Sequence, residues 1–347
     1  MKIKLSFLLI MSILLSSSEI FGTGPSLSEN DLKYYKNQNI VLAKNLDSYF
    51  DNENPGYQSI ERKNALALVD TVTHYPAPHD DCIKELFLSR YKKAIESIEK
   101  THVETGIVIW NVYNLSYIVK TKNITVAFDL IRLPGCLRKK DNEKLYKDLT
   151  KKLINLCDVL FVSHIHSDHA DSFVAGEFLK QKKPVIAPPD VFSNETFYNK
   201  ITHLTPDGKK IKLRVPKINE KLSLRIYPGH QAVAPKKAVD NNFTIITFSN
   251  NITIAHSGDQ CWEEDFKWLD SVYKDSKIDV LMINTWTLLP DRVIKGLKPR
   301  FVLPGHINEM SHELISRKPF WESYQVWKNG GNKIIHLFWG EPYKYEK

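Results

Sequence analysis

A cluster of metal-binding and proton-transferring side chains directly follows one short apolar run. Residues 159–162 are apolar and predict a buried strand. The five ionisable side chains that follow the strand are His164, His166, Asp168, His169 and Asp171. Burying imidazoles and carboxylates costs free energy unless they are hydrogen-bonded, paired or bound to a metal. A single histidine is most often a surface or satisfied core residue, but this spacing after a strand predicts a metal site.

Further motifs of the same character are spread along the chain. Downstream are three triplets, Pro228-Gly229-His230, Ser257-Gly258-Asp259 and Pro304-Gly305-His306, each after a strand-like run. Upstream, the run 125–128 is followed by Asp129. Each triplet alone is a common turn. Together, and in this order, the motifs resemble those of the metallo-β-lactamase superfamily, nearest its ascorbate-phosphate-lactonase-like branch. The resemblance covers the chain from about residue 106 to near the C-terminus.

The resemblance implies two metal ions, most simply zinc, with manganese or iron as alternatives. It assigns His164, His166 and His230 to one metal and Asp168, His169 and His306 to the other, with Asp259 bridging both. Three imidazoles suit zinc, whereas the site with more carboxylate also accepts iron or manganese. Two metals about 3.5–4 Å apart share a hydroxide that acts as the nucleophile. Asp168 is also the expected catalytic residue, orienting that hydroxide or passing a proton to the leaving group.

Two other carboxylates, Asp129 and Asp171, are expected to orient ligands rather than bind metal. A carboxylate that accepts the free N–H of a ligating imidazole fixes its tautomer and orientation. For Asp171 the alternative is a helix N-cap. Trp262, Trp286 and Asn308 lie near the motifs in sequence and are candidates for the wall of a pocket, with core packing as the alternative for both tryptophans.

Alternating strand and helix patterns predict an α/β domain over residues 105–347. The predicted strands are 107–110, 115–119, 124–128, 159–162, 185–187, 211–213, 222–227, 244–248, 252–255, 280–283, 301–303 and 334–338. The predicted helices are 142–156, 171–179, 262–273 and 292–297. Mixed elements of this kind suit a two-sheet core covered by helices. The resemblance implies a four-layer αββα sandwich.

The N-terminal third has a different pattern. Residues 1–22 combine Lys2 and Lys4, an apolar run to Leu15 and small residues, as a signal peptide does. The run is too short for a permanent span of a bilayer, which needs about 20 residues. We therefore expect an exported protein, periplasmic or secreted, without stable membrane insertion. Residues 23–104 predict a helical extension, whose first helix is capped by the pair Ser28 and Asp31.

Composition and charge limit the range of partners. The net charge is +8 and the sequence pI is about 9.0, but the lysines are scattered in short clusters. No long block of like charge is present in the sequence, so we expect a solvated basic face rather than a nucleic-acid-binding surface. The expected partner is a small-molecule substrate.

The motifs together predict a metal-dependent hydrolase that uses a metal-bound hydroxide to cleave a lactone, ester, amide or phosphoester. The alternatives are a non-catalytic metal- or ligand-binding protein and an iron-dependent redox enzyme, both on the same fold. A site without chemistry has no need of a complete ligand set, which disfavours the binding protein. Metal analysis separates the redox enzyme from a zinc hydrolase.

Overall fold

The computed structural model describes residues 28–52, 54–74, 81–132, 134, 137, 142–216, 218, 220–231 and 238–347. The predicted signal peptide, residues 1–22, lies outside these ranges. The chain divides into two compact units, Met1–Leu42 and Ala43–Lys347. Within the described ranges, every helix is too short or too polar to cross a membrane.

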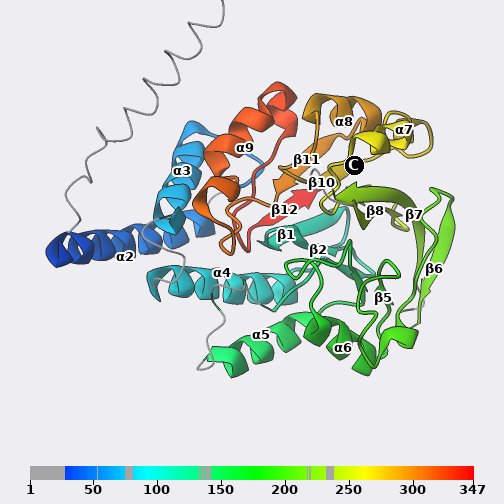
Figure 1. Ribbon diagram of the computed structural model, residues 1–347, viewed down its shortest axis with the longest axis horizontal. Helices are drawn as coiled ribbons and strands as arrows, with labels where there is room; N and C mark the ends of the chain where they lie inside the picture. Colours follow the sequence, from blue (N-terminus) through cyan, green and yellow to red (C-terminus); the bar gives the residue numbers. More distant parts are fainter. Residues whose placement is uncertain are drawn as a thin grey trace, which may run out of the picture. The chain divides into compact units, whose positions relative to one another are not determined.

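Two six-stranded sheets form the centre of the second unit (Figure 1). The first sheet has the order β12 (Pro342–Tyr345), β1 (Ile107–Tyr113), β2 (Ser116–Lys120), β3 (Thr125–Phe128), β4 (Val159–Phe161) and β5 (Val185–Ile186). The second has the order β11 (Phe301–Gly305), β10 (Val280–Asn284), β9 (Thr253–His256), β8 (Val239–Thr247), β7 (Glu220–Gln231) and β6 (Ile211–Val215). Both are mixed sheets, because β3–β4–β5 and β9–β10–β11 are parallel and the other neighbours are antiparallel.

Apolar side chains from both sheets build the main core. Strand residues such as Ile109 and Val126 of the first sheet belong to the same buried cluster as Leu224, Ile254 and Met282 of the second. Each of these side chains is withdrawn from water, which contributes about 1.5–3 kcal/mol for a residue of this size. The strands that carry the site residues are therefore held by the most heavily buried part of the fold.

Helices cover the outer faces of the two sheets (Figure 1). On the first sheet, α4 (Asp81–Lys100) packs on β1 and α6 (Ser172–Lys180) on β4 and β5, with α5 (Glu143–Asn155) in contact with both helices. On the second sheet, α7 (Phe266–Leu269) and α8 (Pro290–Leu297) contribute to a second apolar cluster with Ile245, Leu281 and Ile283. The predicted four-layer αββα sandwich is confirmed.

The predicted N-terminal helices are present as α2 (Glu29–Asn52), α3 (Ile60–His74) and α4. The backbone N–H of Ser28 donates to Asp31 Oδ2 at 2.9 Å, and the N–H of Asp31 donates to Ser28 Oγ at 3.2 Å. The predicted capping pair is therefore confirmed. Helix α3 lies beside α9 (Phe320–Val326), a helix that the sequence pattern did not predict (Figure 1).

Three segments differ from the sequence-based predictions. The predicted helix 262–273 is three short turns, η5 (Glu263–Asp265), α7 and η6 (Val272–Lys274). The predicted strand 334–338 forms an isolated bridge between Ile334 and Val302 in place of a ladder, and the N–H of His336 donates to the side chain of Gln58. The last strand is β12. Strand β7 continues through Pro228-Gly229-His230, because these residues pair in register with Asn242, Asn241 and Asp240 of β8.

Candidate metal site

Most of the predicted site residues come from loops that follow the ends of four strands. Asp129 follows β3, and the His-x-His-x-Asp-His segment follows β4. Asp259 lies three residues after β9, and His306 follows β11. The chain turns sharply after β4, since the backbone N–H groups of His169 and Ala170 both donate to the carbonyl of His166, at 3.0 and 2.8 Å. This turn gathers the short motif at one edge of the first sheet.

Four of the predicted ligands converge at one point. The ligand atoms of Asp168, His169, Asp259 and His306 all lie within 4.8 Å of one another. His169 Nε2 is 3.1 Å from Asp168 Oδ2 and 3.4 Å from Asp259 Oδ2. His306 Nε2 is 3.3 Å from each of the same two oxygens. Two ligands of a tetrahedral Zn²⁺ with bonds of about 2.0–2.1 Å are about 3.3 Å apart, so these distances match the edges of such a site.

Two buried atoms at this point have no hydrogen-bond partner among the described residues. They are His169 Nε2 and Asp259 Oδ1. Leaving a buried polar atom unsatisfied costs about 1–3 kcal/mol, and more for a charged group. Coordination to a cation satisfies both atoms at once. The residues present therefore fit a divalent metal ion.

His164 and His166 lie beside this group. His164 Nε2 is 3.1 Å from His166 Nδ1 and 3.9 Å from Asp259 Oδ2. Burial lowers the pKa of His164 to about 3, with a smaller contribution from the charge of His169. His164 is therefore neutral, as a metal ligand must be.

His230, from β7, is outside the group of four close ligand atoms in the described chain. Its Nδ1 lies 2.7 Å from Asp265 Oδ1, and its backbone N–H donates to the other oxygen of Asp265 at 2.9 Å. An Nδ1–H bound to a carboxylate leaves Nε2 with its lone pair, which is the arrangement of many metal-ligating histidines. The sequence pattern had no signal for Asp265, which lies 35 residues after His230.

Asp129 and Ser163 fix the orientation of two ligand histidines. Asp129 Oδ2 accepts from Ser163 Oγ at 2.6 Å and lies 2.7 Å from His169 Nδ1. Since the Ser163 hydroxyl donates to Asp129, its oxygen accepts from His164 Nδ1, at 3.0 Å. Both rings then carry a proton on Nδ1 and direct Nε2 toward Asp259. The contact that the sequence predicted for Asp129 is present.

Asp171 has the alternative role that the sequence analysis described. Its side chain accepts from the backbone N–H groups of Phe173 and Val174 and caps α6. It also accepts from Arg132 Nε at 2.8 Å. This N-cap fixes the start of the helix that follows the metal-binding turn.

The charges of the site favour a cation at its centre. Burial alone would lower the pKa of His169 and His306, but the nearby carboxylates outweigh it. They raise the pKa of His306 to about 10 and that of His169 well above its usual range. The same pairs hold the pKa of Asp168 and Asp259 well below their usual range, although burial alone would raise it. A proton or a metal ion supplies the positive charge that the two carboxylates attract.

Two side chains that the sequence did not single out contact these carboxylates. Asn114 Nδ2 donates to Asp168 Oδ2 at 2.8 Å, and Gln231 Nε2 donates to Asp259 Oδ2 at 3.0 Å. Asn114 is in the left-handed region, with a φ of 52°, at the turn between β1 and β2. An Asn in a tight turn between strands was the available signal for Asn114.

Trp286 contacts the site directly. Its indole Nε1 donates to His306 Nδ1 at 2.8 Å. Trp286 also lines a cavity of about 610 Å³ together with His166, Asp259 and His312. Trp262 does not line this cavity, and Asn308 is buried and donates to Asp70.

Gly258 allows the close packing that places Asp259. Its φ is +52°, and a Cβ there would lie 2.0 Å from Asn241 Oδ1 and 2.5 Å from Ser163 Cβ. Asn241 Oδ1 accepts from the backbone N–H of Asp259 at 3.0 Å. A residue larger than glycine would therefore push Asn241 and Ser163 away from the site.

Comparison with known proteins identifies the fold. No protein-family model matches the chain, and no curated protein matches it. The metallo hydrolase Igni18 from Ignicoccus hospitalis is similar in structure, with a TM-score of 0.50 and 16% identity over 70% of this chain and 100% of that one. A variant of CmlA β-hydroxylase, an enzyme of Streptomyces venezuelae, has a TM-score of 0.50 and 12% identity over 81% of this chain and 62% of that one.

A third solved structure, an isothiocyanate hydrolase from Delia radicum gut bacteria, has a TM-score of 0.48 and 14% identity, covering 69% of this chain and 100% of that one. At these identities the likeness concerns the fold. Two mixed six-stranded sheets between helical layers, with N-terminal helices added, define a metallo-β-lactamase-like fold.

Proposed function

We propose that this protein is a metal-dependent hydrolase. The observation that carries the proposal is the set of four contacts of 3.1–3.4 Å between the imidazoles of His169 and His306 and the carboxylates of Asp168 and Asp259. The metallo hydrolase Igni18, which shares the fold, supports the same class. Bound Zn²⁺ lowers the pKa of water to about 7 and polarises a carbonyl or phosphoryl oxygen.

Some residues of the site are proposed to hold metal ions, and one is proposed to transfer protons. His164, His166 and His230 would hold one zinc ion, Asp168, His169 and His306 would hold the second, and Asp259 would be a ligand of both. Mn²⁺ or iron is the alternative in the second position. Asp168 is the proposed catalytic base and acid, because it is 21% exposed in its side chain while His169 and His306 are buried. It accepts a proton at its carboxylate and returns it to the leaving group.

The cavity next to the site favours a small substrate. It is about 610 Å³, within the range of small-molecule pockets. Its wall combines the indole of Trp286 with polar groups of His312, Glu313 and Ser311. We therefore propose a small ester-like molecule with an apolar portion that lies against Trp286. The motif resemblance to the ascorbate-phosphate-lactonase-like branch makes lactones the first class to test.

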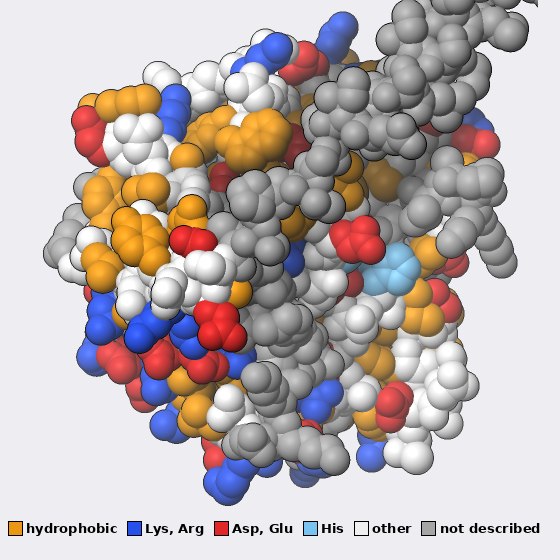
Figure 2. Space-filling view, turned by 60° about the vertical axis from the view of Figure 1, so that its left-hand side comes forward, with side chains coloured by type: hydrophobic (Ala, Val, Ile, Leu, Met, Phe, Trp, Pro, Cys, Tyr) orange, Lys and Arg blue, Asp and Glu red, His pale blue; other side chains and the backbone are white. Residues whose placement is uncertain are grey.

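The surface charge also favours a small substrate over a nucleic acid. On the face drawn in Figure 2, basic and acidic side chains are interspersed rather than separated into one basic stripe. Nucleic-acid binding depends on a basic patch that neutralises many phosphates. The net charge of +8 is thus proposed to keep the protein soluble and to attract small anionic substrates.

The proposal is tested by substrate turnover together with metal content. Purified protein is assayed with lactones, carboxylic esters, a phosphodiester and a β-lactam, while bound metals are quantified. Zinc-dependent hydrolysis of one class, lost after chelation and restored by Zn²⁺, is the expected result. Bound iron with oxygen-dependent turnover would instead indicate an iron-dependent redox enzyme. This alternative is retained because a β-hydroxylase has a similar fold. Bound metal without turnover of any class would indicate a binding protein.

A further inference from the structure

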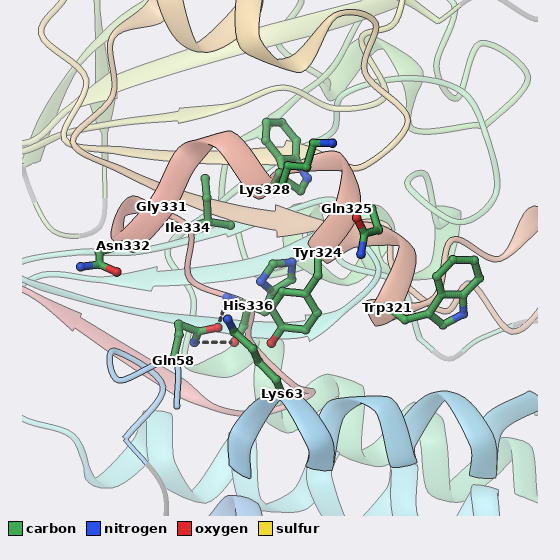
Figure 3. Close-up of a pocket in the computed structure, with 11 residues that line it drawn as sticks. Gln58, Lys63, Trp321, Tyr324, Gln325, Lys328, Gly331, Asn332, Ile334 and His336 are labelled. Atoms are coloured by element: carbon green, nitrogen blue, oxygen red, sulfur yellow. Dashed lines mark hydrogen bonds between the residues drawn. The ribbon is translucent and has the colours of Figure 1, made fainter. Parts of the chain in front are cut away.

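A second cavity, of about 530 Å³, lies between α3 and α9 (Figure 3). It is lined by Lys63 of α3, by Tyr324 of α9, and by Trp327, Lys328 and His336 of the following segment. Figure 3 shows the rings of Tyr324 and His336 next to each other, with Lys63 beside the phenol. Their ring centroids are 4.1 Å apart. None of these residues belongs to the candidate metal site.

Three buried polar atoms at this cavity have no hydrogen-bond partner among the described residues. They are Tyr324 Oη, Trp327 Nε1 and His336 Nδ1. Trp327 and His336 are only 4% and 1% exposed. Because unsatisfied buried polar atoms are rare in native proteins, three at one cavity indicate that a polar molecule occupies it.

A chain of hydrogen bonds defines what His336 offers. The Thr285 hydroxyl donates to the carbonyl of Gly305 at 3.0 Å, so its oxygen accepts from Ser323 Oγ, at 3.3 Å. The oxygen of Ser323 then accepts from His336 Nε2 at 2.9 Å. Burial, with the charges of Arg62 and Lys63, lowers the pKa of His336 to about 3, so the ring is neutral. Its Nδ1 is therefore an acceptor and requires a donor from the occupant.

The other groups require acceptors and a negative charge. The indole N–H of Trp327 can only donate. Burial raises the pKa of the Tyr324 hydroxyl, so this group keeps its proton. Two lysines, Lys63 and Lys328, line the cavity, and its described lining contains no acidic side chain. Lys63 Nζ lies 5.6 Å from the centre of the Tyr324 ring.

We propose that this cavity binds a small aromatic hydroxycarboxylate. The carboxylate of the ligand pairs with Lys63 and accepts from Trp327 Nε1 and from the Tyr324 hydroxyl. The hydroxyl of the ligand donates to His336 Nδ1, and its ring lies against the 58% exposed Trp321. The hydrogen-bond chain from His336 ends at Gly305, the neighbour of His306, so the ligand contacts a network that continues to the backbone of the metal site.

The test uses the full chain and three probes, the 2-, 3- and 4-isomers of hydroxybenzoate, titrated by calorimetry and followed by ligand-observed NMR. Benzoate lacks the hydroxyl and 3-hydroxybenzamide lacks the charge. At least one hydroxybenzoate is expected to bind with one site per chain, and benzoate and the amide about tenfold more weakly. Lys63→Met should weaken the binding of the best isomer at least about fivefold, and Tyr324→Phe should weaken it as well. Lys63 is exposed, so the first variant folds normally.

Lys333→Met is the matched control, because Lys333 is an exposed lysine near the cavity that does not line it. It should leave binding unchanged. Binding of the hydroxybenzoate should also persist in Asp259→Ala. A hydroxybenzoate that bound only at the candidate metal site would bind this variant more weakly. The proposal is overturned if none of the three isomers binds below about 10 mM, or if binding is the same in Lys63→Met and Lys333→Met.

Discussion

His169 Nδ1 lies 2.7 Å from the Asp129 carboxylate, while His169 Nε2, on the other side of the ring, faces Asp168 and Asp259. Asp129 therefore decides which nitrogen of His169 is available to a cation. Through Ser163 it has the same influence on His164. A single buried carboxylate thus sets the tautomer of two predicted ligands.

Asp129→Asn should weaken metal binding. An amide presents one acceptor oxygen, whereas Asp129 accepts from the backbone and hydroxyl of Ser163 and from His169. The expected loss of metal affinity is about 10–100-fold, measured by competition with a chromophoric chelator. Asp148→Asn, on the exposed face of α5, is the control. Equal metal affinity in the two variants would show that Asp129 does not orient a ligand.

Asp168→Asn should reduce turnover more than it reduces metal content. The amide is close in shape to the carboxylate, but it cannot accept a proton or supply negative charge. Turnover on the best substrate should fall by about 10²–10⁴-fold, while an ion held by His164, His166 and His230 remains bound. Metal quantification and steady-state kinetics on one preparation provide the measurement. Full turnover in this variant would remove Asp168 from the chemistry.

Gly258→Ala should both destabilise the protein and displace Asp259. A methyl group there would collide with Asn241 and Ser163, and the residue would also keep an unfavourable positive φ. Gly331→Ala is the matched control, because Gly331 has a φ of +56° but no atom within 4 Å of a new Cβ. Gly331, with φ 56° and ψ −140°, lies in a region almost exclusive to glycine, so Gly331→Ala has a backbone cost of about 1–3 kcal/mol. A larger loss of stability in Gly258→Ala therefore measures the clash. We expect Gly258→Ala to be less stable by at least about 1 kcal/mol; equal stabilities would contradict the packing.

Asp70 links α3 to the loop after His306 and should give a pH-dependent stability. It accepts from the backbone N–H groups of Phe320 and Trp321 and from Asn308. Burial raises the pKa of Asp70 to about 6, although these bonds lower it. The folded protein therefore holds a proton that the unfolded chain releases near pH 3.8.

The stabilisation from protonated Asp70 is complete below the unfolded pKa and is lost as the pH rises through about 6. Urea unfolding of the natural protein and Asp70→Asn between pH 4 and pH 7 isolates this effect. The natural protein should lose about 2 kcal/mol relative to the variant over that range, because each unit of pKa shift corresponds to about 1.4 kcal/mol and pH 4 lies just above the unfolded pKa. Parallel stability curves would show that the pKa of Asp70 is not raised.

Local patterns predicted much of the fold. Short β-branched runs such as 107–110 and 280–283 became strands because they are buried on both faces. The periodic helix near residues 83–98 became α4. The segment 334–338 has the same apolar character, but the backbone N–H of His336 donates to the side chain of the distant Gln58, and the N–H of Phe338 donates to the nearby Glu341. Strand propensity of single residues carries no information on such tertiary contacts.

Sequence patterns likewise predicted some residues of the candidate site and missed others. The short motif after β4 predicted His169 and Asp168 because the chemistry is concentrated within a few residues. Asp265 and Gln231 were missed because their contacts with His230 and Asp259 depend on how distant loops meet. The role of Asp171 stayed open in the sequence because an N-cap and a histidine partner use the same carboxylate. In the structure, its hydrogen bonds to the first turn of α6 make Asp171 the N-cap of that helix.

The most direct test of the account is the metal content of the purified protein and two variants, measured by mass spectrometry after dialysis. The natural protein should hold about two divalent ions per chain. Asp259→Ala removes the carboxylate shared by His169 and His306 and should lose most of the bound metal, with a folded circular dichroism spectrum. His102→Ala, at an exposed histidine, should keep the full content. A natural protein that binds no divalent metal, or an Asp259→Ala variant with the full content, would contradict the metal site.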